Sequence, residues 1–194
     1  MQAKERETFY PSSGKEWRKW LKENHQTKQS IWVLCYKQAA GIPTVSWSDL
    51  VDEALCFGWI DSTRVSLGDG KFIQFLTRRK PRSNWSKINK DKVARLIEEG
   101  RMTKAGYDSI ETAKKNGSWT LLDKVEALTI PKELAAEFRL RPGSRKYFMG
   151  LSRSVKKMML QWVAMAKRPE TKLKRATEIA ENAAEGRKPK QFLG

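Results

Sequence analysis

The order of hydrophobic and polar residues predicts a first half in which strands alternate with helices. Apolar runs rich in β-branched and aromatic residues predict three strands, at Ser30–Lys37, Arg64–Leu67 and Lys71–Leu76. The tripeptide Gly68-Asp69-Gly70 separates the last two strands, which is typical of a hairpin turn. The sequence therefore predicts a small antiparallel sheet.

Helices are predicted wherever apolar residues recur at helical spacing. Gly58 follows one such stretch in the position that favours a left-handed C-cap. Residues that can cap a helix precede four of these stretches: Ser13, in a capping-box pattern with Glu16, then Ser46 or Ser48, Asn89 and Thr103.

From Ile130 onward the pattern is entirely helical. Pro169 interrupts it, because a proline pushes the preceding residue out of helical geometry. These apolar stripes are typical of a helical core rather than of a groove for a partner. The two stripes consist of Val155, Met158, Met159, Trp162, Val163 and Ala166, and of Leu173, Ala176, Ala180 and Ala183.

These patterns together predict an α+β fold, with a small antiparallel sheet covered by helices and an all-helical C-terminal segment. The α+β domain is predicted at residues 12–125 and the helical segment at residues 130–187. Residues 1–11 and 188–194 are predicted to be flexible ends. A chain of 194 residues is long enough to bury a proper core.

Charge changes this picture, because the formal net charge of +17 is concentrated in two segments. Residues 78–104 hold ten Lys and Arg against three acidic residues, and residues 139–175 hold twelve against Glu170 alone. Such clusters attract anionic partners, which include nucleic acid, phosphorylated ligands and membrane headgroups. The alternative is a solvated surface that keeps the protein soluble.

The two cysteines, Cys35 and Cys56, lie inside apolar runs. This placement predicts buried, reduced thiols in a cytoplasmic protein. The N-terminal residues contain no apolar stretch typical of a secretion signal, and no run approaches the roughly 20 apolar residues that span a bilayer.

The residues that enzymes commonly use are sparse. His25 is the only histidine, and no serine lies in a nucleophile-elbow context. No cluster of metal ligands and no phosphate-binding or dinucleotide-binding fingerprint occurs, so neither a metal nor a cofactor is expected. The sequence favours a non-enzymatic protein, and an enzyme acting on a small acidic or phosphorylated substrate is a further alternative.

A basic loop between the last predicted strand and the Asn89 helix makes the best candidate site. Arginine forks suit phosphate and carboxylate groups, serine hydroxyls and free amides before the helix add neutral donors, and an indole can stack on a base or a sugar. The candidate ligand-binding residues of this loop are Arg78, Arg79, Lys80, Arg82, Ser83, Trp85, Ser86 and Asn89.

The hexapeptide Cys56-Phe57-Gly58-Trp59-Ile60-Asp61 allows two interpretations. In the first, Gly58 turns the chain while the aromatic residues fill the core. In the second, Trp59 and Asp61 form the apolar and polar walls of a ligand pocket opposite the basic loop. The first interpretation is favoured.

Several motifs together resemble those of the YdeI/OmpD-associated (bacteriocin-protection, OmdA-like) family, over residues 17–188. They are Trp20-Leu21-x-x-Asn24-His25, Ala54-Leu55-Cys56-Phe57-Gly58-Trp59-Ile60-Asp61, Arg79-Lys80-Pro81-Arg82-Ser83-x-Trp85-Ser86-x-x-Asn89, Gly100-Arg101-Met102 and Ala166-Lys167-Arg168-Pro169-Glu170-Thr171. The resemblance implies an N-terminal α+β part, a helical C-terminal part, and a role in protection against bacteriocins. It assigns no catalytic residues, and association with a porin is implied by the family name alone.

The leading hypothesis is a non-enzymatic cytoplasmic protein, associated with stress or antimicrobial resistance, that binds an anionic ligand at the loop 78–89. Many antimicrobial peptides are cationic, and a chain of charge +17 would repel them, so protection would be indirect. The alternative hypothesis is a nucleic-acid-binding protein that uses both basic segments.

Overall fold

The computed structural model describes residues 7–193, which form two compact units. The first unit ends at Trp119 and the second begins at Thr120. The sequence placed the end of the first domain at residue 125. Leu122 and Val125 instead contribute buried side chains to the core of the second unit.

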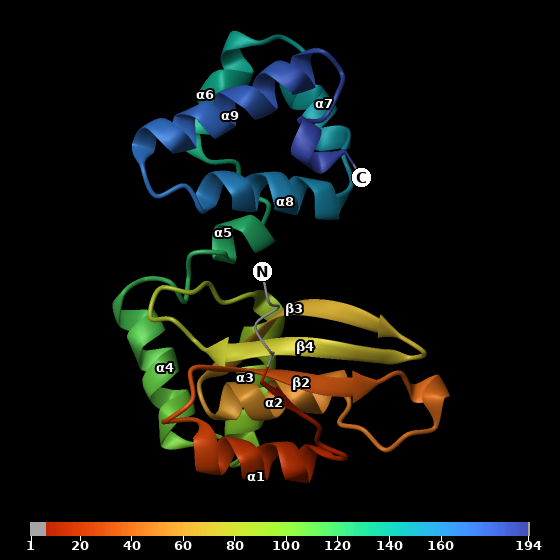
Figure 1. The fold of residues 1–194 in the computed structure, drawn as a ribbon. Helices are drawn as coiled ribbons and strands as arrows, with labels where there is room; N and C mark the ends of the chain where they lie inside the picture. Colours follow the sequence, from red (N-terminus) through yellow and green to blue (C-terminus); the bar gives the residue numbers. More distant parts are fainter. Residues whose placement is uncertain (1–6, 194) are drawn as a thin grey trace, which may run out of the picture. The chain divides into compact units, whose positions relative to one another are not determined.

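The first unit contains the predicted sheet, and the α+β fold class is confirmed (Figure 1). Strands β2 (Ser30–Tyr36), β3 (Trp59–Gly68) and β4 (Lys71–Arg78) are antiparallel, and the sheet order is β1-β2-β4-β3. The hairpin turn between β3 and β4 is also as predicted. Its Asp69 and Gly70 both have positive φ, as such a two-residue turn requires.

One strand was missed and makes the sheet mixed. Strand β1 (Thr8–Phe9) pairs parallel with β2, although residues 1–11 were predicted to be flexible; residues 1–6 lie outside the described part of the chain. Its Phe9 stacks on Trp20, with ring centroids 5.7 Å apart. The contact with Trp20 holds Phe9 against the unit. The largely polar sequence of residues 1–11 did not indicate this contact.

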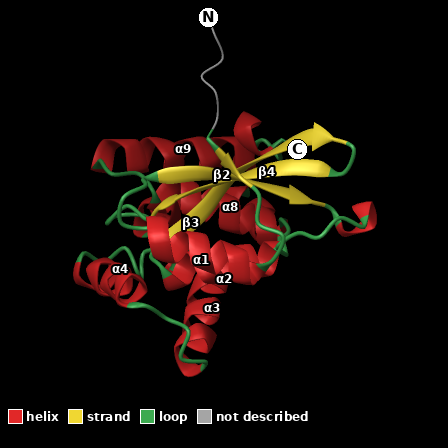
Figure 2. Ribbon diagram, turned by 60° about the horizontal axis from the view of Figure 1, so that its bottom comes forward, coloured by secondary structure: helices red, strands yellow, loops and turns green. Residues whose placement is uncertain are grey.

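Three helices of the first unit begin directly after a serine whose side chain caps the helix. The helical elements of this unit are α1 (Gly14–Asn24), the 3-10 turn η1 (Gln38–Ala40), α2 (Trp47–Cys56), α3 (Lys87–Glu98) and α4 (Lys104–Lys115). Figures 1 and 2 show α1 and α2 on one face of the sheet. Ser13 and Ser46 cap α1 and α2 as predicted. The cap of α3 is Ser86, whose hydroxyl accepts from the backbone N–H of Asn89, so Asn89 is the third helical residue rather than the cap.

Helix α4 crosses the end of α2 at very short range. Gly58 has φ +71°, the left-handed C-cap conformation that was predicted. A Cβ at Gly106 would lie 2.5 Å from the carbonyl oxygen of Cys56, and one at Gly58 would lie 2.8 Å from the carbonyl oxygen of Ala105. The hydroxyl of Thr103 donates to the same Cys56 oxygen at 2.7 Å. The backbones can approach this closely because both positions, 58 and 106, are glycine and carry no Cβ.

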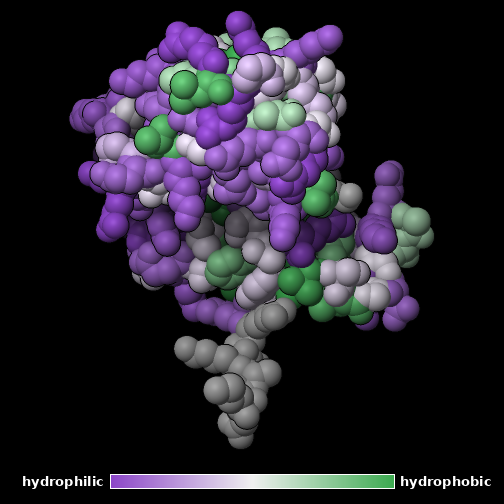
Figure 3. Space-filling model, turned by 90° about the horizontal axis from the view of Figure 1, so that it is seen from above, coloured by the Kyte–Doolittle hydropathy of each residue, from purple (hydrophilic) through white to green (hydrophobic). Residues whose placement is uncertain are grey.

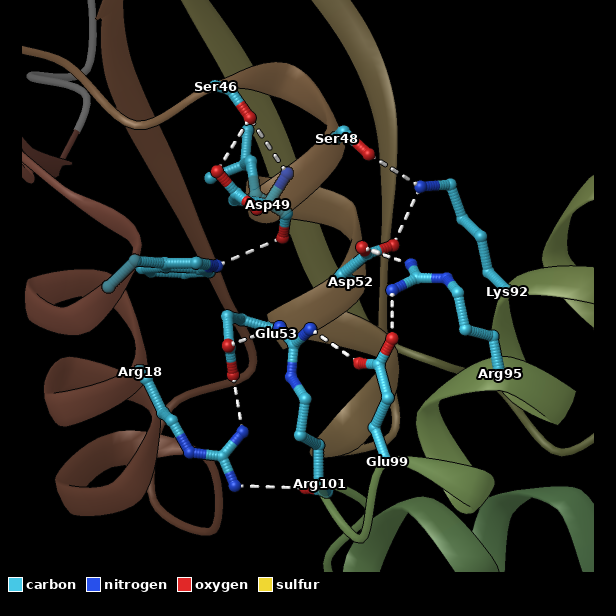
Figure 4. Close-up of polar contacts among 12 residues, drawn as sticks. Arg18, Ser46, Ser48, Asp49, Asp52, Glu53, Lys92, Arg95, Glu99 and Arg101 are labelled. Atoms are coloured by element: carbon cyan, nitrogen blue, oxygen red, sulfur yellow. Dashed lines mark hydrogen bonds and ion pairs between the residues drawn. The ribbon is translucent and has the colours of Figure 1, made fainter.

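Helix α2 also carries two buried carboxylates, Asp52 and Glu53, which are 3% and 6% exposed. Glu53 accepts from Arg18 of α1 at 2.5 Å and from Arg101 after α3 at 2.7 Å (Figure 4). Asp52 accepts from two cations of α3, at 2.6 Å and 2.5 Å. Charge-assisted bonds from this pair therefore reach α1, α3 and the segment that leads to α4.

The two halves of this network are joined through Glu99. Its carboxylate accepts from Arg95, which also binds Asp52, and from Arg101, which also binds Glu53. Figure 4 shows this continuous chain of alternating charges. The seven charged residues of the network are Arg18, Asp52, Glu53, Lys92, Arg95, Glu99 and Arg101.

The second unit is entirely helical in its described part, as predicted. Its elements are α5 (Asp123–Glu126), α6 (Lys132–Leu140), α7 (Ser144–Gly150), α8 (Arg153–Ala164), α9 (Pro169–Ala184) and the 3-10 turn η2 (Lys190–Phe192). The turn η2 lies in an end that was predicted to be flexible. It is held by Phe192, whose ring lies 5.7 Å from that of Trp162.

Helix α9 is the centre of this unit, because α6, α7 and α8 all pack against it. Small buried side chains on α9, Ala176, Ala180 and Ala183, allow this close packing. Two residues of the predicted stripes, Met158 and Leu173, are nearly half exposed. Leu160 and Ile179 lie outside the predicted stripes but are buried.

Within residues 7–193, no helix has the combination of length and hydrophobicity that crossing a bilayer requires.

Replacement of Gly106 by Ala should destabilise the first unit. The new methyl group would meet backbone that cannot move aside, and overpacking of this kind costs about 1–3 kcal/mol. Gly14→Ala is the matched control, because its Cβ would meet nothing closer than 3.4 Å. Urea unfolding followed by tryptophan fluorescence measures both. Equal unfolding free energies for the two variants would contradict the close approach of α4 and α2.

Replacement of Glu53 by Gln should destabilise the same unit by about 1.5–3 kcal/mol, the range for hydrogen bonds to charged groups. The substitution leaves Arg18 and Arg101 without their shared carboxylate. Glu98→Gln removes the same charge from an exposed position of α3 and should change stability by no more than about 0.5 kcal/mol. Chemical denaturation measures the unfolding free energy of both variants. An equally large loss of stability in Glu98→Gln would show that the effect comes from net charge and not from the ion pairs of Glu53.

Candidate functional site

A cavity of about 490 Å³ lies at the corner where α2 ends and β3 begins. Its walls come from the end of α1, the α2–β3 turn, the end of β4 with the basic loop, and the first turns of α4. Because α4 crosses the turn at Gly58, residues distant in sequence meet here. The lining residues are His25, Gln26, Phe57, Gly58, Arg78, Arg79, Pro81, Ala105, Asp108, Ser109 and Thr112.

Arg79 is the most unusual residue of this wall. Its guanidinium lies 3.7 Å from the centroid of the Trp85 ring. One nitrogen, Nη1, donates to the Asn84 carbonyl at 2.8 Å and to the Ser83 hydroxyl at 3.3 Å. The other two nitrogens, Nε and Nη2, are buried and have no hydrogen-bond partner among the described residues. Nε and Nη2 form one edge of the planar fork that arginine uses to bind oxyanions in a bidentate manner.

Burial lowers the pKa of Arg79 to about 10, and the negative charge of Asp61 partly opposes this shift. The side chain is therefore still a cation at neutral pH. A buried cation with unpaired donors is costly, and an anion that accepts from those donors removes part of this cost.

Arg78 and His25 complete the polar edge of the cavity. The exposed guanidinium of Arg78 donates to the carbonyl of Gln26, at 3.4 Å. The imidazole of His25 is held by its Nδ1, 2.9 Å from the Leu21 carbonyl oxygen, and by an edge contact with Phe57. The carboxylate in the lining, Asp108, is paired with Lys104 at 2.7 Å.

Of the sequence-predicted site residues, the cavity brings together Arg78 and Arg79. Trp59 and Trp85 are 0% and 1% exposed, so neither indole presents a face on which an external base could stack. Trp59 donates instead to the carbonyl of His25, which agrees with the core-corner interpretation.

The remaining predicted residues lie outside the cavity wall. Asp61 accepts from Trp47 and Gln74, at 3.4 Å and 3.5 Å. Ser83 holds Arg79, Ser86 and Asn89 form the cap of α3, and Lys80 and Arg82 are exposed.

The sequence did not predict that α1 and α4 contribute to the site. His25 was noted only as a lone histidine, and the residues of α4 carry no motif. One signal was present: Gly106 lies inside a predicted helix, where glycine costs about 1 kcal/mol relative to alanine. A mid-helix glycine indicates close backbone contact, and here that contact forms one wall.

Ion pairing removes much of the charge of the first basic segment. Ion pairs hold the cations Lys87, Lys92, Arg95, Arg101 and Lys104. No ion pair within residues 7–193 is found for Arg78, Lys80 or Arg82. The uncompensated charge is thus concentrated in the loop beside the cavity, not spread along the whole segment.

The second basic segment keeps more of its charge. Arg141, Lys157 and Lys172 are paired with acidic residues, and Arg175 stacks on Trp162. Most of the other cations of this segment are exposed.

Both thiols are poor nucleophiles. Burial raises the pKa of Cys35 to about 11, and burial together with the charge of Glu53 raises the pKa of Cys56. Neither thiol therefore forms the reactive thiolate readily at neutral pH. Within residues 7–193, no group of three or more His, Cys, Asp or Glu is arranged to hold a metal ion.

Comparison with known proteins gives two family matches. Residues 9–109 match a domain of unknown function, DUF8412. Residues 127–186 match the family described as Bacteriocin-protection, YdeI or OmpD-Associated, which confirms the predicted resemblance for the helical unit. The motifs before residue 127 that also suggested this family lie outside the match. No curated protein and no solved structure matches the chain. The chain therefore belongs to the DUF8412 domain family, and its helical unit carries the Bacteriocin-protection, YdeI or OmpD-Associated domain.

Proposed function

We propose that this chain is a non-enzymatic cytoplasmic protein that binds an anionic ligand in the cavity beside Arg79. The observation that carries the proposal is the buried guanidinium edge of Arg79, with Nε and Nη2 both unpartnered among the described residues. A planar carboxylate or a phosphate matches that edge with two parallel hydrogen bonds.

The surroundings of Arg79 favour binding over a structural role alone. Arg78 adds a second guanidinium at the cavity, and its bond to Gln26 is long enough to be exchanged for one to a ligand. The cavity volume of about 490 Å³ is within the usual range for small-molecule sites, roughly 300–1,000 Å³.

The family name suggests that binding of the anionic ligand contributes to bacteriocin protection. A protein associated with bacteriocin protection and carrying a charge of +17 repels cationic peptides, so we propose that protection proceeds through the anionic ligand. The buried thiols of Cys35 and Cys56 are compatible with a reducing compartment.

Titration calorimetry with inorganic phosphate at constant ionic strength tests the proposal. The Arg78→Gln variant should bind phosphate about tenfold more weakly, because a charge-assisted hydrogen bond is lost. The matched control is Arg82→Gln, which removes the same charge from the same loop but not from the cavity wall, and it should stay within about twofold of the unmodified protein.

Arg79→Lys separates geometry from charge, since lysine keeps the charge but lacks the fork. We expect weaker phosphate binding in this variant as well, with circular dichroism to confirm that the fold is retained. Equal weakening in Arg78→Gln and Arg82→Gln would mean that phosphate responds to net charge. No binding at all would mean that buried water satisfies the donors of Arg79.

A further inference from the structure

A second cavity lies wholly within the helical unit, at the turn between α6 and α7. Its volume is about 330 Å³, and its lining consists of Ile130, Ala135, Phe138, Arg139 and Arg145. This volume is at the low end for ligand sites, roughly 300–1,000 Å³. The cavity therefore suits a single small molecule rather than a peptide or a two-chain lipid.

The two arginines are brought to this cavity by the tight turn. Gly143 has φ +81°, a conformation that favours glycine, and it reverses the chain between the helices. The hydroxyl of the fully buried Ser144 donates to the carbonyl of Arg141 at 2.6 Å and fixes the turn. Arg139 and Arg145 are thus held on either side of one rigid corner.

Neither of these arginines is neutralised within the unit. Among residues 120–193, Arg139 and Arg145 form no ion pair, whereas Arg141 between them is bound by Glu137 and Glu181 at 2.5 Å and 2.9 Å. Glu137 and Glu181 are therefore already engaged by Arg141. No carboxylate lines the cavity itself.

The rest of the lining is apolar. Phe138 is 5% exposed and packs against Phe148, with ring centroids 5.3 Å apart, so this wall is fixed by the core. Ile130 and Ala135 supply the remaining apolar surface. An inorganic anion would leave this surface in contact with water, and an uncharged apolar molecule would leave both arginines unpaired.

The face of the molecule seen in Figure 3 is mostly hydrophilic, and its hydrophobic side chains lie scattered among hydrophilic ones. The concave site at the α6–α7 corner is where apolar walls and unpaired cations meet.

We propose that this cavity binds a small amphiphilic anion, whose apolar part contacts Ile130, Ala135 and Phe138 and whose carboxylate or phosphate is held by Arg139 and Arg145. The site is independent of the cavity beside Arg79, because the two lie in different units.

Titration calorimetry of the full chain with octanoate tests this site. At the site that Arg145→Gln weakens, octanoate should bind more than tenfold more tightly than octanol or inorganic phosphate, because only octanoate engages both kinds of wall. Arg145→Gln should weaken octanoate binding about tenfold. The matched control Lys146→Gln removes the same charge from an exposed position of α7 outside the cavity and should remain within about twofold.

A second variant tests the apolar part without a change of charge. Ala135→Leu fills the cavity and should abolish octanoate binding, while helical circular dichroism shows that the unit is folded. Equal binding by Arg145→Gln and Lys146→Gln, or unchanged binding by Ala135→Leu, overturns the proposal. Binding to anionic vesicles with no affinity for free octanoate also overturns it, in favour of a membrane surface contact. Arg78→Gln should leave unchanged the part of octanoate binding that Arg145→Gln weakens, so failure at one cavity is distinguishable from failure at the other.

Discussion

The buried carboxylates of Asp52 and Glu53 are the interaction on which the first unit depends. Two acids inside a protein are tolerated only when cations pair with them, and here the cations come from α1, α3 and the segment before α4. Pairing therefore fixes α1, α3 and the segment that leads to α4 around α2. The end of α2 is fixed as a result, and with it the turn at Gly58 that forms the floor of the cavity.

This arrangement also determines where positive charge remains available. Cations of α3 that seem free in the sequence are neutralised by acids of α2, forty or more positions earlier in the chain. The loop after β4 has no such partner, and its Arg79 is held by stacking on Trp85 instead of by a carboxylate. Within the first basic segment, the uncompensated charge is therefore localised in this loop.

Local patterns predicted the elements that depend on local physics. The apolar runs at β2 and β4, the Asp69-Gly70 turn and the Gly58 cap all follow from local residue preferences and were predicted from the residues alone. The cap of α3 was misassigned, because Ser86 and Asn89 are both good caps and only geometry separates them.

The candidate site was predicted in part. The sequence identified Arg78 and Arg79 as candidate ligand-binding residues, because they belong to a dense run of cations without nearby acids. It could not identify the contributions of α1 and α4, which depend on how helices cross, nor the burial of Trp59 and Trp85, which depends on what packs over them. A parallel strand of two residues, such as β1, is likewise fixed by its tertiary partner and not by its own composition.

The division into two cores has a spectroscopic consequence. Of the eight tryptophans, seven lie before the boundary at Trp119/Thr120 or at it, and only Trp162 lies beyond it. Intrinsic fluorescence is therefore dominated by the α+β unit, while α-helical ellipticity also reports on the helical unit. The chain carries two natural signals of different origin, and a difference between their melting curves would reveal whether the two cores unfold as one cooperative system or as two.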